Sequence, residues 1–137
     1  MDFFCAGVPV AQGSKRHVGG GVMVEQLKNL QPWREALINA AHNAPSQEVF
    51  FGPVRLSVIF RFPRPKGHYG TGRNAELLKP SAPRFKTSAP DLDKLIRAVG
   101  DALTMAGTLR DDCLIVSLEA AKIYDELPGA KVVIIHA

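Results

Sequence analysis

The sequence feature that most limits the fold is a stretch of regular alternation at residues 54–62. Apolar side chains take every second position of this stretch: Val54, Leu56, Val58, Phe60 and Phe62. Arg55, Ser57 and Arg61 take positions between them. Because successive side chains of a strand point to opposite faces of a sheet, this period of two predicts a half-buried β-strand. The rest of the chain must supply its neighbouring strands and a layer that covers its apolar face.

Two further segments have helical spacing. Trp33, Leu37 and Ala41 follow Pro32, which suits a first helical turn, and the pattern predicts a helix over about 32–44 that ends before Pro45. A second run carries apolar residues at i, i+3, i+4 and i+7: Leu92, Leu95, Ile96, Val99, Ala102 and Leu103. Asp91 is a good N-cap for this helix, and Gly107 is a good stop signal.

The remaining apolar runs predict three more strands. They cover Phe3–Val10, a run from Leu114 toward Lys122, and Lys131–His136 after the turn at Pro128-Gly129. The order βαβ(loop)αββ predicts an α+β fold in which two helices pack on a four-stranded mixed sheet. A length of 137 residues predicts a single domain, residues 1–137.

The bulk composition points to a protein without a membrane span or disulfides. The N-terminus has no basic leader, and its apolar patch is too short for a signal segment or a membrane span. We therefore expect a cytoplasmic protein, in the bacterial host cytoplasm if a phage encodes it. Cys5 and Cys113 have no metal-ligand spacing, and we expect Cys113, at the head of an apolar run, to be a buried reduced thiol.

Charge is distributed unevenly along the chain. Residues 1–90 hold twelve Lys/Arg and five Asp/Glu, a balance of +7, whereas residues 91–137 hold five and eight, a balance of −3. Eight of the basic residues fall between Arg55 and Lys86, against a single acid, Glu76. Within this region the loop of about 63–90 predicts salt-dependent contact with DNA phosphates, and Tyr69 and Phe85 are candidates for stacking on bases. The alternative is a flexible solvated loop without a partner.

Four aspartates flank the second helix. Asp91 and Asp93 stand at its start, and Asp111 and Asp112 follow its end. Mg²⁺ is usually held by one or two carboxylates together with substrate phosphates, so these acids suggest a metal-assisted reaction on a polyanion. The alternative is structural: acids suit a first helical turn, and Asp93, Arg97 and Asp101 have the spacing of i,i+4 ion pairs. Asp111 and Asp112 also suit a turn.

Other metal and nucleotide sites are excluded by spacing. A calcium loop starting at Asp91 would need Gly and Glu where Ile96 and Ala102 stand. The chain has no Gly-x-x-x-x-Gly-Lys-Ser/Thr loop and no His-Glu-x-x-His motif.

The acidic motif resembles that of a known family. Pro90-Asp91-Leu92-Asp93-Lys94-Leu95, then Asp101-Ala102-Leu103, Asp111-Asp112 and Lys122, closely resemble the RusA-like family of Holliday junction resolvases. Gly7-Val8-Pro9 with Lys15-Arg16 resemble the family's opening strand and basic loop. The resemblance differs at two positions, because Lys94 stands where the family has Asn and Arg97 where it has Lys.

The resemblance implies a homodimeric, Mg²⁺-dependent endonuclease that cuts four-way DNA junctions symmetrically, with Mn²⁺ as the other candidate ion. Such enzymes are common in phages. The implied metal ligands are Asp91, Asp93 and Asp112, supported by Asp111, and Arg97 joins Asp91, Asp93 and Asp112 as a catalytic candidate. Because arginine hardly gives up a proton, we expect Arg97 to stabilise phosphate charge. The candidate DNA-binding residues are Lys15, Arg16, Arg64, Lys66, Arg73, Arg84 and Lys86.

Two other functions fit the same residues. One is a metal nuclease with broader specificity for branched DNA, such as forks or flaps. The other is a junction-binding protein with weak or no catalysis, for which Lys94 and Arg97 are the motivation. A plain basic DNA-binding module with structural acids is a third alternative.

Overall fold

The chain forms one mixed sheet with two helices. A computed structural model describes the backbone of residues 1–13 and 20–137 and the side chains of residues 1–13 and 28–137. The elements follow in the order β1 (Asp2–Ala6), α1 (Gly20–His42), β2 (Val54–Phe62), α2 (Leu92–Met105), β3 (Ile115–Tyr124) and β4 (Gly129–His136). The strand order is β1-β4-β2-β3, with β2 and β3 parallel and the other neighbours antiparallel. The predicted α+β architecture is confirmed.

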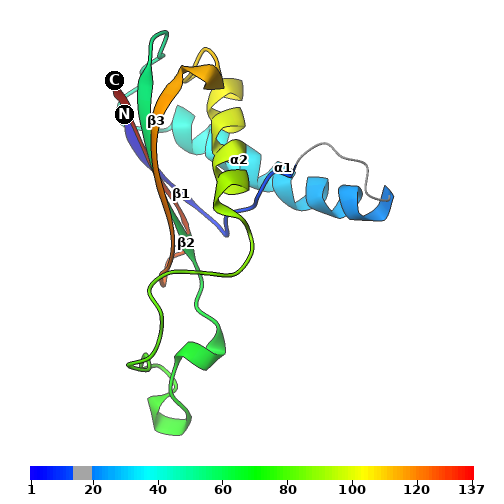
Figure 1. Ribbon diagram of the computed structural model, residues 1–137, viewed down its shortest axis with the longest axis vertical. Helices are drawn as coiled ribbons and strands as arrows, with labels where there is room; N and C mark the ends of the chain where they lie inside the picture. Colours follow the sequence, from blue (N-terminus) through cyan, green and yellow to red (C-terminus); the bar gives the residue numbers. More distant parts are fainter. Residues whose placement is uncertain (14–19) are drawn as a thin grey trace.

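Both helices lie on the same face of the sheet, and the other face is open (Figure 1). The alternating residues of β2 explain this arrangement, because the five apolar side chains of the alternating pattern, Val54, Leu56, Val58, Phe60 and Phe62, are buried beneath the helices. The predicted apolar face of α2 supplies the other half of the core, with Leu95, Val99 and Leu103 almost inaccessible to solvent. Burying a side chain of this size stabilises the fold by roughly 1.5–3 kcal/mol, so packing fixes α2 firmly on the sheet.

α2 forms part of the crossover between β2 and β3. Parallel neighbours cannot be joined by a tight hairpin, and the connection usually contains a helix. The chain leaves β2 at Phe62, makes a long excursion, and returns through α2 to the start of β3. The start of β3 therefore lies close to the C-terminal end of α2. This places Asp111 and Asp112 next to that end of the helix.

Two predicted boundaries near the N-terminus were wrong. The first strand ends at Ala6 instead of Val10, because Gly7 has a φ of +126° and turns the chain away from the sheet. α1 begins at Gly20, so Pro32 lies inside it and not in its first turn. A proline removes one hydrogen bond from a helix, and packing of neighbours such as Trp33 and Leu30 in the core offsets that loss.

The third strand also differs from its prediction. β3 begins at Ile115, and none of its residues is fully buried, with Val116 and Leu118 more than half exposed. The reason is position, since β3 is an edge strand and has a single neighbour. The same location corrects the prediction for Cys113, which is exposed, whereas Cys5 is buried and burial raises its pKa to about 11.

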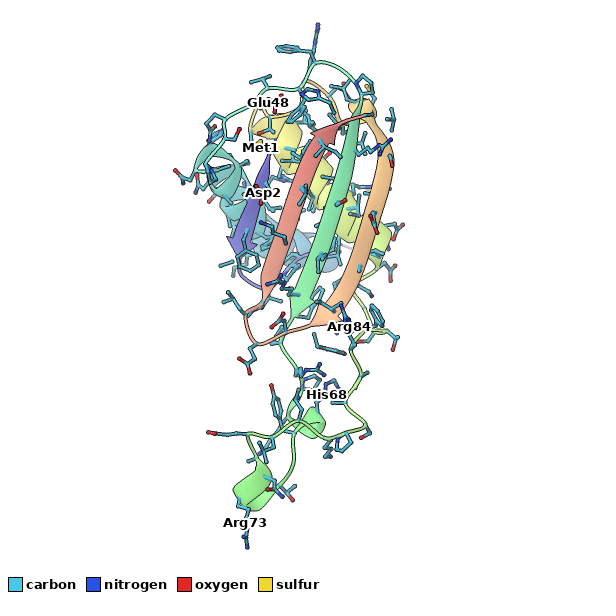
Figure 2. All side chains as sticks on the ribbon, turned by 90° about the vertical axis from the view of Figure 1, so that its left-hand side faces the viewer. Met1, Asp2, Glu48, His68, Arg73 and Arg84 are labelled. Atoms are coloured by element: carbon cyan, nitrogen blue, oxygen red, sulfur yellow. The ribbon has the colours of Figure 1, made fainter. Side chains whose placement is uncertain are left out.

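Residues 63–90, called the arm below, extend beyond one end of the sheet (Figures 1 and 2). The sequence predicts an irregular loop here, and the arm does lack long elements. It contains two short 3-10 turns, Lys66–His68 and Gly72–Asn74, and backbone hydrogen bonds between its two sides. One joins Lys79 N–H to the His68 carbonyl at 2.9 Å. The arm is therefore a folded projection of the domain.

No helix within residues 1–13 and 20–137 is long and apolar enough to cross a membrane.

Candidate active site

The first acidic pair lies where the arm meets α2. Asp91 is the N-cap residue of α2, and its carbonyl accepts a hydrogen bond from Leu95 N–H at 3.1 Å. Its carboxylate makes no capping hydrogen bond and instead lies 3.5 Å from Lys94 Nζ. Asp93 follows in the first turn, and both acids are exposed. Their carboxylates are therefore accessible to a ligand from solvent.

The ion pairs that would give the acids of α2 a purely structural role are only partly formed. Among the side chains that the structure describes, Lys94–Asp91 is the sole ion pair within α2. Neither Asp93–Arg97 nor Arg97–Asp101 approaches within the 4.0 Å of a salt bridge. Arg97 is exposed, one turn from Asp93 on one side and from Asp101 on the other. Its guanidinium is free to contact a phosphate.

The second acidic pair is crowded. Asp111 caps the short 3-10 turn Asp112–Leu114, with its Oδ1 accepting a hydrogen bond from Cys113 N–H at 3.0 Å. This bond lowers the pKa of Asp111. The pKa of Asp112 is raised, first by its hydrogen bond with Asp111, then by partial burial and by the negative charges of Asp111 and Asp101. Such crowding is relieved when a cation neutralises the carboxylates.

The two acidic pairs lie at different positions along the axis of α2. Asp112 packs against Gly100, where an added Cβ would lie 3.6 Å from the Asp112 Cβ. Gly100 is seven residues after Asp93, so the two are on the same side of the helix but roughly 10 Å apart along its axis. Within the described residues, no three His, Cys, Asp or Glu side chains gather closely enough to hold a metal ion. The expected convergence of Asp91, Asp93, Asp111 and Asp112 into one cluster is therefore not found in the single chain.

The donor set still fits a magnesium ion in its usual manner of binding. Mg²⁺ needs only one or two protein carboxylates when substrate phosphates and water complete its octahedron. The Asp111–Asp112 pair has oxygen donors, accumulated negative charge and an exposed position. Asp91 and Asp93 supply a second exposed pair at the N-terminal end of the helix.

Asp101 is a further acid whose environment was not predicted. Sequence spacing suggested an ion pair with Arg97, but Asp101 Oδ2 accepts a hydrogen bond from Gln12 Nε2. Gln12 Oε1 in turn accepts from Arg34 at 2.9 Å, and Gln12 N–H donates to the Lys94 carbonyl at 3.0 Å. Gln12 is 89 residues away from Asp101 in the sequence, so no local pattern could reveal this contact.

The base of the arm is organised around Tyr124, at the end of β3. The guanidinium carbon of Arg64 lies 5.4 Å from the Tyr124 ring centre, and Lys86 Nζ lies 5.6 Å from it. His68 packs edge-on against the same ring, with 4.8 Å between centroids. Arg64 also donates to the Pro83 carbonyl at 2.6 Å. Arg64 and Lys86 are therefore half-buried cations that hold the arm as well as candidates for DNA contact.

The other predicted DNA-binding residues are more exposed. Arg84 lies at the base of the arm and Arg73 at its far end, and both point into solvent (Figure 2). Lys66 is also exposed. Lys15 and Arg16 lie outside the described residues. The described cations therefore form a positive projection that adjoins the Asp91 end of α2.

Comparison with known proteins identifies the family. The sequence model described as Endodeoxyribonuclease RusA matches residues 6–135, which is nearly the whole chain. The chain belongs to the RusA family of endodeoxyribonucleases. The resemblance seen in the acidic motif is thereby confirmed, as is the expected enzyme class, a crossover junction endodeoxyribonuclease.

One relative among curated proteins has a similar length. "Uncharacterized protein YqaN" of Bacillus subtilis (strain 168) is 28% identical over 141 residues. The match covers 98% of this chain and 94% of that protein.

Proposed function

We propose that this RusA-family protein resolves Holliday junctions by Mg²⁺-dependent, paired hydrolysis of two phosphodiesters, leaving nicked duplexes with 5′-phosphates. The family match supports nuclease activity on crossover junctions. The observation that carries the metal dependence is the crowded Asp111–Asp112 pair, whose charges favour a bound cation. The exposed Asp91 and Asp93 carboxylates at the N-terminal end of α2 supply further oxygen donors.

Each group has a defined task in this proposal. Asp111 and Asp112 at one position along α2, and Asp91 and Asp93 at the other, would each hold Mg²⁺, or Mn²⁺ in its place, with DNA phosphate oxygens completing each ligand set. The ion would lower the pKa of a bound water and offset charge on the transferring phosphoryl group. Cations of the arm would hold the DNA backbone, and this affinity should depend strongly on salt. Arg97 lies between the two acidic pairs along α2 and would neutralise charge on the phosphate.

Two equivalent incisions call for two equivalent sites. A four-way junction has near two-fold symmetry, and a C2 dimer presents the same site twice in matching orientation. We therefore propose a homodimer on branched DNA.

The proposal is tested with synthetic DNA. The protein is incubated with a mobile four-way junction, a replication fork and a plain duplex, each with and without Mg²⁺. We expect cleavage of the junction alone, only with the ion, into two nicked duplexes that DNA ligase reseals. Equal cutting of forks would indicate a broader branched-DNA nuclease. Tight junction binding without cleavage under Mg²⁺ or Mn²⁺ would indicate a binding protein and would contradict the proposal.

The role of Arg97 has its own test. Arg97→Lys keeps a positive charge on the same helical face, so we expect cleavage within about ten-fold of the unaltered protein. Arg97→Ala removes the charge and should lower the cleavage rate by on the order of 10²-fold, as for other lost electrostatic contacts to a transition state. Single-turnover rates on the mobile junction measure both. Equal rates for all three proteins would make Arg97 an ordinary surface residue of α2.

A further inference from the structure

The last residues of the arm run alongside the end of β3. Tyr124 N–H donates to the Arg84 carbonyl at 3.0 Å, and Lys86 N–H donates to the Lys122 carbonyl at 3.1 Å. Phe85 pairs with Ile123 between them. Residues 84–86 therefore pair antiparallel with the end of β3, a few residues before the chain enters α2.

The side chain of Lys122 continues this attachment. Lys122 pairs with Phe60 in the parallel register, so it lies on the helix-covered face of the sheet. Its Nζ donates to the Ser88 carbonyl at 2.9 Å and to the Pro90 carbonyl at 2.7 Å. Hydrogen bonds from an ammonium group are stronger than those between neutral groups. One side chain thus bridges the final turn of the arm, up to the residue before Asp91.

Few other contacts fix the position of the Asp91 carboxylate. Its carboxylate does not cap α2, and its one ion-pair partner in the described part of the chain, Lys94, is 3.5 Å away. The position of the carboxylate therefore depends on the backbone at residues 90–91. Lys122 holds that backbone through the Pro90 carbonyl, and no ion pair with a described acid occupies its ammonium group.

We propose that Lys122 is a positioning residue for Asp91: it fixes the turn that places this carboxylate for metal binding and cleavage. The inference rests on the proposed function, because it takes Asp91 to be a metal ligand. Lys122 acts through the backbone and touches neither DNA nor the reacting atoms. A displacement of about 1 Å at a catalytic group can lower a rate on the order of 10²-fold. Loss of the hydrogen bonds from Lys122 should therefore lower the cleavage rate.

The first test compares three variants. Lys122→Met keeps the length of the side chain but loses both hydrogen bonds, and Lys122→Arg keeps donors for the two carbonyls. Lys131→Met is the matched control, because it removes a lysine that pairs with Asp2 on another strand. We expect Lys122→Met to lower single-turnover cleavage about a hundred-fold, with junction affinity and its salt slope unchanged. Lys122→Arg should restore most of the rate, and the control should cleave normally.

The second test needs no cleavage. Mn²⁺ is titrated into the free protein, and paramagnetic broadening of the Asp91–Asp93 amide signals reports binding. Loss of positioning predicts weaker Mn²⁺ binding in Lys122→Met by several-fold, whereas simple removal of a positive charge predicts tighter binding. Tighter or unchanged binding, or a reduced salt slope on DNA, would overturn the proposal. If the unaltered protein cleaves no branched DNA, the proposed function fails, while this titration still decides the role of Lys122.

Discussion

Asp93→Asn should abolish junction cleavage while leaving junction binding intact or tighter. The substitution keeps the size and polarity of the side chain and removes only the negative charge that would hold a divalent cation. We expect the single-turnover rate to fall by at least on the order of 10³-fold, which corresponds to about 4 kcal/mol of transition-state stabilisation. Binding should not suffer, because the loss of an acid near DNA phosphates reduces electrostatic repulsion.

The structural alternative predicts a different outcome for Asp93. If the acid serves only the first turn of α2, its loss costs about 0.3–1 kcal/mol of stability and leaves the rate unchanged. Thermal unfolding separates the two effects. Glu119→Gln is a matched control, because it makes the same chemical change at an exposed acid of β3. Normal cleavage by Asp93→Asn would remove this residue from the mechanism.

The double variant Arg84→Ala with Lys86→Ala should bind junctions more weakly and with less dependence on salt. Both residues lie at the base of the arm, where DNA held by the arm would approach Asp91. Each phosphate contact contributes roughly 0.9 to the slope of log affinity against log salt, so the slope should fall by about two. At low salt the affinity should drop on the order of ten- to a hundred-fold. Binding is measured with Ca²⁺ in place of Mg²⁺ across a salt series.

Two controls make this result specific. Arg55→Ala with Lys131→Ala also removes two positive charges, but from the open face of the sheet, where Arg55 opposes Ile135 and Lys131 opposes Ile59. Lys86 also lies 5.4 Å from the Phe62 ring centre, so the melting temperature of the double variant must be compared with that of the parent. An unchanged salt slope in a folded arm variant would locate the DNA surface elsewhere.

Local periodicity predicted the layers of this fold correctly. The alternation of β2 and the helical spacing of α2 each arise from which face meets the core, and both elements bury the residues that their patterns indicate. Boundaries were less predictable. Gly7 ends β1 through its backbone conformation, and Pro32 lies within a helix that packing maintains on both sides. The exposure of Val116 and Cys113 depends on β3 being an edge strand, which no local pattern specifies.

For the candidate site, the sequence provides candidate residues, and their roles stay a prediction, but it does not provide the geometry. The sequence identified Asp91, Asp93, Asp111 and Asp112 because four acids flank one helix in an otherwise basic chain. It could not show that Asp112 packs against Gly100, which separates the two pairs along the helix axis. It also could not reveal contacts made across the fold, such as those of Gln12 with Asp101.

The arm and the acidic helix are one continuous piece of chain, which has a mechanical consequence. Lys86 is paired to the edge strand β3, and five residues later Asp91 is the N-cap of α2, whose apolar face is buried in the core. If the arm binds DNA as proposed, a force on the arm would reach the Asp91 carboxylate through a connection of only a few residues. In the proposed function, DNA binding by the arm and alignment of the acids would thus be coupled by the shortness of this connection.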